Sequence, residues 1–227
     1  MLYNKFLYEI SDDTDFKKMK KAIDEKNKEL NYLKKKWFKT SKINLRIQNI
    51  QKDIEGAEFA CKEYLEIKHR REKILAASVF DLKTSVIGTS FRIQNVKKAV
   101  KHIYDDNGLS LFEGLKNKEI EEEGYDRVYK HDSLFTRDFN LTREPDNEYD
   151  KNAIKVTVDE FHIGYIPKDI ALKLAPVLDS TDYKIEAMLN VKGGPYKTFD
   201  YEKDKVIIID GNYGFDINGL VVDKNRL

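Results

Sequence analysis

Apolar positions in the first third of the chain recur at helical spacing, in two series. The first consists of Phe16, Met19, Ile23, Leu30, Leu33 and Trp37, and the second of Ile43, Ile47, Ile50, Ile54, Ala57, Cys61 and Tyr64. Steps that alternate between three and four residues are typical of a coiled-coil seam. Between positions 11 and 81 there is no proline and a single glycine, Gly56. We therefore predict a helical region over residues 1–80.

The two series do not share one register, because the steps from Trp37 through Thr40 to Ile43 are both three. Thr40 and Ser41 are good cap or turn residues, which predicts a break there and an antiparallel helical hairpin. The alternative is one unbroken helix over residues 13–77, roughly 95 Å long at 1.5 Å per residue. Neither form buries its seam alone, so the helices must fold back, dimerise or clamp another protein. We expect a homodimer through the N-terminal helices.

The pattern changes at Thr84 to short alternating runs that are typical of strands. "VKKAVKHIY" and "PKDIALKLAPVLDS" have helical spacing, the second opening with Pro167, and "KEIEEEGYD" suits a loop or short helix. "GNYGFDINGLVVDKNRL" is interpreted as a glycine-punctuated tail. The predicted strands are "TSVIGTSFRI", "RVYKH", "LFTRDFNLTRE", "AIKVTV", "FHIGYIP", "YKIEAMLNV" and "KVIIID".

Five or more short strands with a covering helix predict a small, partly closed barrel or sandwich over residues 81–227. The fold class is therefore α+β, with two domains of residues 1–80 and 81–227. Charge follows this division. Residues 13–78 hold 18 Lys and Arg against 11 Asp and Glu, whereas residues 79–227 hold 22 against 27. This asymmetry suggests different partners for the two parts, although a lysine-rich helix also simply stays soluble.

Composition and motifs favour a binding protein over an enzyme. One cysteine, Cys61, excludes a disulfide framework and a cysteine-based zinc cage, and no early apolar run is long enough to cross a membrane. The default is a soluble, cytoplasmic protein. The four histidines are scattered without metal-ligand spacing, and the sequence has neither a phosphate-binding glycine loop nor a nucleophile elbow. We expect no catalytic activity, no cofactor and no metal.

Residues 143–156, "REPDNEYDKNAIKV", concentrate turn-forming side chains in front of a strand. Pro145 ends one strand by removing a hydrogen-bond donor. Asp146 and Asn147, and then Asp150 and Asn152, can fold the backbone through side-chain-to-main-chain bonds. On physical grounds alone, this stretch is a tight connection between two strands.

This stretch, followed by "HIGYIPKDIALKLA" and preceded by "SVIGTSFR", closely resembles the HIRAN domain signature over about residues 84–179. The helical N-terminus lies outside the resemblance. The resemblance implies an OB-like β-barrel that captures a single-stranded DNA end, particularly a free 3′-hydroxyl. Carried over, the implied pocket residues are Phe91, Asn147, Tyr149, Asp150, Tyr165 and Lys168.

In the implied pocket, Phe91 or Tyr149 stacks on a base, Asp150 accepts a hydrogen bond from the 3′-hydroxyl and Lys168 meets the adjacent phosphate. The purely structural alternatives are a core position for Tyr149 and a turn-holding role for Asp150. This chain has Ser90-Phe91 where eukaryotic DNA-binding members have Arg-Tyr, and Tyr165 where they have histidine. Arg92 can supply the missing charge, although in a regular strand it points to the opposite face.

Two functions follow from these observations. The first is a DNA-end-binding module, a phage or mobile-element accessory in DNA repair or replication, with single-stranded DNA as its partner. The second is a protein-interaction or inhibitor role, in which the acidic barrel and helical arm grip a DNA-acting enzyme of DNA metabolism or defence and the pocket is vestigial. No membrane partner is expected.

Overall fold

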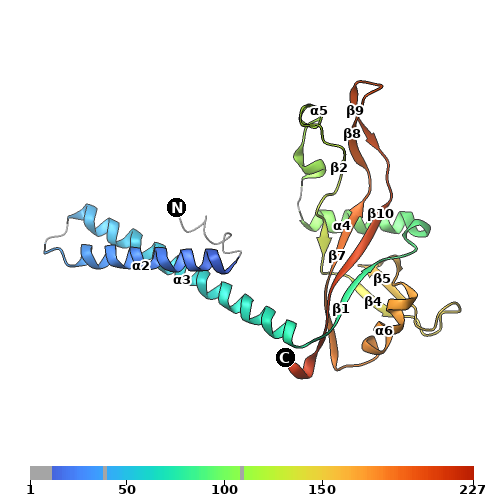
Figure 1. Cartoon of the computed structure of the whole chain (residues 1–227), viewed down its shortest axis with the longest axis horizontal. Helices are drawn as coiled ribbons and strands as arrows, with labels where there is room; N and C mark the ends of the chain where they lie inside the picture. The colour runs from blue at the N-terminus through green and yellow to red at the C-terminus, as the bar shows by residue number, and fades with distance from the viewer. Residues whose placement is uncertain (1–11, 38–39, 108–109) are drawn as a thin grey trace. The chain divides into compact units, whose positions relative to one another are not determined.

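The computed structural model of the chain describes residues 12–37, 40–107 and 110–227. The chain divides into two compact units, residues 1–74 and 75–227 (Figure 1). None of the described helices is both long and apolar enough to cross a membrane.

The first unit is an antiparallel pair of helices, α2 (Asp13–Lys34) and α3 (Ser41–Ala76). The hairpin, rather than one unbroken helix, is therefore the form that the chain adopts. Thr40 caps α3, since its Oγ1 accepts from the amide of Ile43 (3.3 Å). Trp37 is 93% exposed, so its predicted place in the apolar seam is wrong. The side chains that form the core are Met19, Ile23, Leu30, Leu33, Ile47, Ile50, Ile54 and Cys61.

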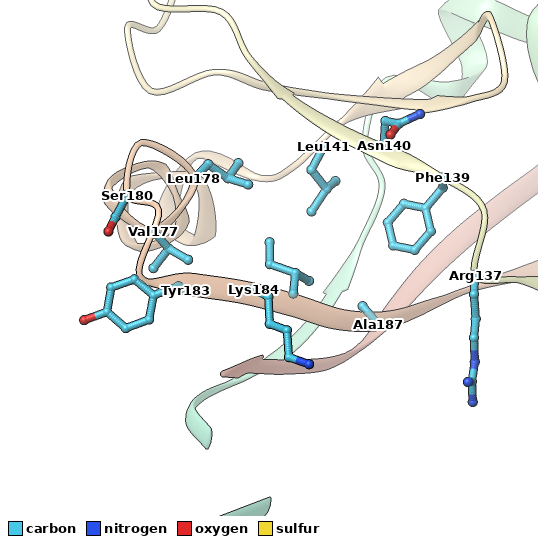
Figure 2. Close-up of a pocket in the computed structure, with 11 residues that line it drawn as sticks. Arg137, Phe139, Asn140, Leu141, Val177, Leu178, Ser180, Tyr183, Lys184 and Ala187 are labelled. Atoms are coloured by element: carbon cyan, nitrogen blue, oxygen red, sulfur yellow. The ribbon is translucent and has the colours of Figure 1, made fainter. Parts of the chain in front are cut away.

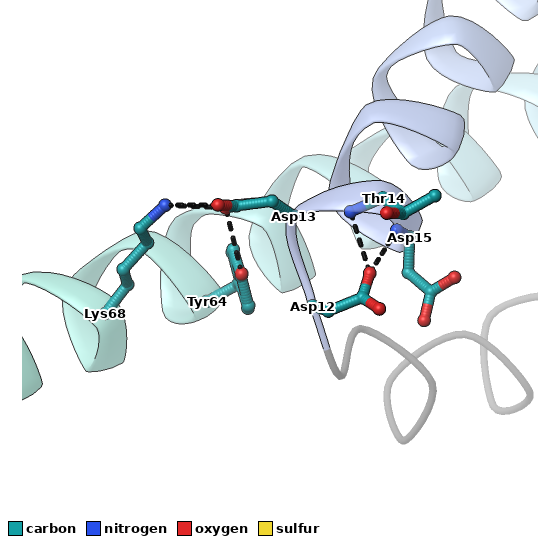
Figure 3. Close-up of polar contacts among 6 residues, drawn as sticks. All are labelled: Asp12, Asp13, Thr14, Asp15, Tyr64 and Lys68. Atoms are coloured by element: carbon teal, nitrogen blue, oxygen red, sulfur yellow. Dashed lines mark hydrogen bonds and ion pairs between the residues drawn. The ribbon is translucent and has the colours of Figure 1, made fainter.

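Polar contacts fasten the end of the hairpin that carries the start of α2 (Figure 3). Asp13 Oδ1 accepts from Lys68 Nζ (2.6 Å) and from Tyr64 Oη (3.1 Å). The hydrogen bond from Lys68, followed by that from Tyr64, lowers the pKa of Asp13. Asp12 caps α2 by accepting from the amides of the residues two and three positions on. The seam is thus buried within one chain, and the homodimer stays a prediction.

The second unit contains ten strands and three α-helices among its described residues. The helices are α4 (Ile93–Asn107), α5 (Asn117–Glu123) and α6 (Lys168–Leu178). The strands are β1 (Ser78–Ser85), β2 (Val128–Tyr129), β3 (Phe135–Thr136), β4 (Asn140–Arg143), β5 (Ile154–Val158), β6 (Phe161–Tyr165), β7 (Tyr183–Gly193), β8 (Tyr196–Asp200), β9 (Lys205–Ile209) and β10 (Tyr213–Asp223).

These strands form three sheets with orders β1-β10-β7-β3, β2-β8-β9 and β4-β5-β6, and every pairing is antiparallel. The architecture is thus a mixed helix-and-sheet fold, and the pairings among the described residues close no barrel. The core lies beneath two helices rather than one. The buried residues that α4 contributes are Val96, Ala99, Val100 and Ile103, and those from α6 are Ala171, Leu174 and Ala175.

The predicted glycine-punctuated tail is wrong, because it forms β10, an inner strand of the four-stranded sheet. β10 pairs with β7 along its whole length, from Tyr213 opposite Gly193 to Asp223 opposite Tyr183. At Gly219, a Cβ atom would lie 2.4 Å from the Cβ of Ala187 on β7. The glycine permits a close approach between strands and does not end the strand.

The predicted strand "TSVIGTSFRI" is wrong beyond Ser85, where β1 ends. Gly88 adopts a left-handed conformation (φ 76°), and the 3₁₀-helix η1 (Thr89–Arg92) follows and leads directly into α4. A left-handed residue turns the chain out of the extended path, and glycine does so without steric cost. The side chains of η1 therefore do not alternate between two faces as those of a strand would.

Candidate functional site

The connection between β4 and β5 is built by side chains that bond to their own backbone. Asn147 Oδ1 accepts from the amides of Tyr149 (3.0 Å) and Asp150 (3.2 Å), and Asp150 Oδ1 accepts from the amide of Asn152 (2.9 Å). The predicted turn-forming roles of Asn147 and Asp150 are thus confirmed. Among the described residues, the side chains of Asp146 and Asn152 form no such bond.

Glu144 links this turn to the neighbouring strands, a role that the sequence analysis missed. Its Oε2 accepts from Tyr165 Oη (3.0 Å) and from Asn147 Nδ2 (3.2 Å), and its Oε1 is ion-paired with Lys155 Nζ (3.2 Å). Burial raises the pKa of Glu144, but the hydrogen bonds from Asn147, Tyr165 and Lys155 outweigh it and leave the pKa lowered. A carboxylate next to a turn gives no signal in the sequence that it contacts three separate segments.

Arg92 lies against Tyr165, which the expectation of a regular strand did not foresee. Its guanidinium carbon is 5.0 Å from the centre of the Tyr165 ring, within the range of a cation–π contact. Arg92 Nη1 donates to the carbonyl of Gly88 (3.1 Å), and Nε donates to Nδ1 of His162 (3.4 Å). Because Arg92 belongs to η1 and not to a strand, its charge remains on the same side as Tyr165.

His162 completes this cluster as a neutral side chain. Its Nε2 lies 3.0 Å from the carbonyl oxygen of Gly164. If Nε2 carries the proton and donates to that carbonyl, Nδ1 is left to accept from Arg92, which is the only consistent assignment for both contacts. Burial, followed by the positive charge of Arg92, lowers the pKa of His162. The neutral imidazole therefore accepts a hydrogen bond from Arg92 and places no second positive charge beside the guanidinium.

A backbone bridge between Ile87 and Tyr165 brings the η1 segment to β6. Each amide donates to the other residue's carbonyl at 2.9 Å. Gly164 makes this approach possible, because a Cβ there would lie 2.3 Å from the carbonyl oxygen of Ile87. The glycine of "HIGYIP" is thus needed for the contact between two segments that lie more than seventy residues apart in sequence.

Two aromatic side chains of the predicted site are open to solvent. Phe91 is 89% exposed and lines a shallow hollow formed by residues 90–95, while Tyr149 is 91% exposed. The alternative in which Tyr149 is a core residue is therefore wrong. Exposed large aromatic rings are unfavourable in water and are available for stacking on a ligand.

Lys168 and Asp150, two charged residues of the predicted site, each have polar atoms that could still contact a ligand. Lys168 is the first residue of α6, is exposed, and forms no ion pair within the described part of the chain. Asp150 uses Oδ1 to hold the turn, and its Oδ2 accepts no hydrogen bond from any described residue. The turn-holding role of Asp150 and a ligand-binding role are therefore compatible, because they use different oxygens.

Arg143 is a second residue whose role the sequence did not reveal, and it connects the turn to the residue that follows α6. Its Nη1 donates to the carbonyl of Lys151 (3.0 Å), and its Nε donates to the carboxylate of Asp179 just after α6 (3.2 Å). The Arg-Glu pair before Pro145 thus has a supporting role. Contacts connect Arg92 with Tyr165 and, through Glu144, with the Asn147 turn. Phe91 and Lys168 take no part in these contacts and are connected to them only along the chain, as the residue before Arg92 and the third residue after Tyr165.

A separate cleft of about 240 Å³ opens between β4, the end of α6 and β7 (Figure 2). Its lining mixes apolar side chains, including Phe139, Leu141 and Leu178, with polar and charged ones, including Arg137 and Lys184. None of the predicted site residues lines it. Within the described residues, no cluster of His, Cys, Asp or Glu is arranged to hold a metal ion.

Comparison with known proteins identifies the second unit. The model of the HIRAN domain family matches residues 125–201, so the chain contains a HIRAN domain. The match covers the 144–153 turn and Tyr165 and Lys168, and it begins after Phe91 and Arg92. The roles of those last two residues therefore depend on the resemblance of "SVIGTSFR" alone.

Curated relatives match the chain over short stretches. The chain is 45% identical over 53 residues to a Fanconi-associated nuclease 1 homolog of Arabidopsis thaliana, covering 23% of the chain and 6% of that protein. It is 46% identical over 50 residues to the helicase-like transcription factor of Oryctolagus cuniculus, covering 22% and 5%. The chain thus corresponds to a small fraction of these relatives.

Among solved structures, the HIRAN domain of human HLTF aligns with 64% of this chain and 79% of its own chain, at 20% identity and a TM-score of 0.29. A TM-score this low supports no conclusion about the fold, which is defined by the chain's own strands and helices.

Proposed function

We propose that the second unit is a DNA-binding module that captures the end of a single strand through its free 3′-hydroxyl. The observation that carries this proposal is the geometry of the Asn147 turn. That turn holds Asp150 by one carboxylate oxygen and leaves the other without a partner among the described residues. The HIRAN domain found at residues 125–201 and the resemblance of the turn to the family signature support the same interpretation.

The chemistry of Asp150 suits this ligand. An ionised carboxylate only accepts hydrogen bonds, and a terminal 3′-hydroxyl has a proton to donate. An internal nucleotide has no such group, and a 3′-phosphate is repelled by the carboxylate. Oδ2 of Asp150 would therefore select a free end over both alternatives.

The remaining residues supply binding that does not depend on sequence. Stacking of a base on Phe91 or Tyr149 is worth about 1–3 kcal/mol and tolerates any base. Lys168 would contact the phosphate next to the end, and Arg92, held by Tyr165, would supply a second cation. Residues 79–227 hold 27 acidic against 22 basic side chains, which favours a pocket for two or three nucleotides over a long tract.

In this proposal the unit binds DNA and performs no chemistry. The relatives that carry similar segments are named as a nuclease and a helicase-like factor, in which such a module would direct a separate catalytic part to DNA. We infer an accessory role in DNA repair or replication for this chain, and its phage or mobile-element setting stays a prediction.

Fluorescence anisotropy with single strands that differ only at the 3′ end tests the proposal. A strand with a free 3′-hydroxyl should bind the full chain at least 10-fold more tightly than the same strand with a 3′-phosphate. Equal binding of both strands, or of neither, would refute end capture.

The cleft between β4, α6 and β7 favours a second candidate, the binding of a segment of a partner protein (Figure 2). In that case, substitution of Leu141 by Ser would abolish association with a DNA-acting enzyme and leave the anisotropy with DNA unchanged. Substitutions at Asp150 would show the opposite pattern.

A further inference from the structure

The end of the hairpin at which α2 connects to α3 is strongly positive. Between Glu29 and Asp53 the sequence has seven Lys and Arg residues and no Asp or Glu. The two flanking acids are already engaged, since Glu29 is ion-paired with Arg46 and Asp53 with Lys26. The opposite end of the hairpin carries both signs, with Asp12, Asp13 and Asp15 close to Lys17, Lys18, Lys20 and Lys21.

The lysines at this end are available to a ligand. Lys34, Lys35, Lys36 and Lys42 are all exposed, and none of them forms an ion pair within the described residues. Lys34 is the last residue of α2, the next two lysines follow it directly, and Lys42 lies in the first turn of α3. The antiparallel pairing of the helices therefore gathers cations from two segments at one end.

Two exposed aromatic rings accompany these lysines. Trp37 is 93% exposed and Tyr32 is 65% exposed, and the Nζ of Lys36 lies 5.2 Å from the centre of the Tyr32 ring. Trp37 occupies a position that continues the apolar series of α2, yet the core of the hairpin excludes it. Cations beside exposed aromatic rings are the combination that binds unpaired nucleic acid, with phosphates on the cations and bases on the rings.

We propose that this end of the hairpin, defined as the basic tip by Tyr32, Lys34, Lys35, Lys36, Trp37 and Lys42, is a second nucleic-acid-binding surface that grips single-stranded DNA along its length. It lies outside the HIRAN domain and needs no strand end. The hairpin residues alone indicate a surface for a polyanion, and the choice of DNA as that polyanion rests on the function proposed above.

Intrinsic fluorescence reports directly on the basic tip, because Trp37 is the only tryptophan of the chain. The probe is a single strand of about 20 nucleotides, longer than the ~4–16 nucleotides of one typical binding site, with a 3′-phosphate that removes the hydroxyl contact to Asp150. Titration of the full chain with this strand at low salt should quench the emission of Trp37.

Two four-lysine variants separate the basic tip from general positive charge. Replacing Lys34, Lys35, Lys36 and Lys42 by Ala should weaken binding of the blocked strand by at least 10-fold. It should also make the slope of log K against log salt shallower by about 3, at ~0.7 for each phosphate that is no longer neutralised. The control replaces Lys17, Lys18, Lys20 and Lys21 at the other end of α2, removes the same charge, and should weaken binding less than about 3-fold.

Circular dichroism must show unchanged helix content in both variants. Equal losses in the two variants, or no quenching of Trp37 by the blocked strand, would overturn the proposal. A blue shift of Trp37 emission with phosphatidylserine vesicles, without quenching by DNA, would overturn it in favour of a lipid surface. Failure of end capture leaves these results intact, because the blocked strand never engages Asp150.

Discussion

The phenol of Tyr165 donates a hydrogen bond to Glu144 (Oη to Oε2, 3.0 Å), and this contact joins the end of β6 to the turn that follows β4. Burial, followed by the hydrogen bond to Glu144, raises the pKa of Tyr165, so the phenol remains a donor throughout the physiological range. Through Arg92 on its ring face, Tyr165 also connects the turn to η1. Three segments that are distant in sequence are thereby held around one tyrosine.

Replacement of Glu144 by Gln should lower the free energy of unfolding at neutral pH by about 1–2 kcal/mol, since charge-assisted hydrogen bonds are worth more than neutral ones. The folded state lowers the pKa of Glu144 from its ordinary value of 4.5. The carboxylate therefore stabilises the fold above that value, and the stabilisation is lost as the pH falls through the lower, folded pKa.

Chemical denaturation of the wild type and of Glu144→Gln from pH 7 down to pH 3 measures this effect. The difference between the two should shrink as the pH drops below about 4.5. Glu160→Gln, an exposed carboxylate on the same unit, is the matched control and should change stability little. If the difference in the free energy of unfolding between the two proteins is the same at every pH, the charge of Glu144 does not stabilise the fold.

Replacement of Gly164 by Ala should destabilise the second unit by about 1–3 kcal/mol, because the added Cβ would lie 2.3 Å from the carbonyl oxygen of Ile87. Hydrogen exchange should accelerate at the amides of Ile87 and Tyr165, which form the bridge. Gly124→Ala is the control, since nothing lies within 4 Å of its added Cβ. It should cost only its left-handed backbone strain and leave those two amides protected.

Replacement of Asp150 by Asn separates ligand binding from turn formation. The amide oxygen of Asn can still accept from the backbone of Asn152, so the melting temperature should change little. The second oxygen becomes an NH₂ group, and binding of a 3′-hydroxyl strand should weaken roughly 10-fold, as for the loss of a charge-assisted bond of ~1.5–3 kcal/mol. A variant that binds 3′-hydroxyl strands as well as the wild type would show that Asp150 has a structural role alone.

Replacement of Phe91 by Ala should weaken single-strand binding by about 5- to 150-fold, which corresponds to ~1–3 kcal/mol of stacking. Because the ring is 89% exposed, thermal stability should be unaffected. Tyr149→Ala tests the other exposed ring in the same way. Anisotropy and thermal melts of both variants tell which ring stacks, and unchanged affinity in both would exclude aromatic stacking at this site.

Replacement of Lys168 by Ala should weaken strands with free and blocked 3′ ends alike. Lys168 is assigned to a phosphate, so its loss should make the salt slope shallower by about 0.7 for a single strand. Lys173→Ala, on a later turn of the same helix, is the control and should change neither affinity nor slope. A selective loss for free ends would instead place Lys168 at the hydroxyl.

Features that depend on neighbouring residues could be predicted from the sequence alone. The broken register at Thr40 indicated a helical hairpin as one of two alternatives, and Thr40 caps α3 as expected. The turn at Asn147 and Asp150 followed from side chains that bond to their own backbone a few residues away. Such features are local, so a short window of sequence contains all the groups that take part in them.

Features that depend on distant partners became visible only in the folded chain. The segment ending at Asp223 is an inner strand because β1 and β7 flank it, which no window around its glycines reveals. Glu144 became a link between segments, and Arg92 came to lie on Tyr165, because Gly88 turns the chain and Gly164 admits Ile87. These contacts require the backbones of distant segments to approach one another, and the packing of the whole unit sets the geometry of that approach.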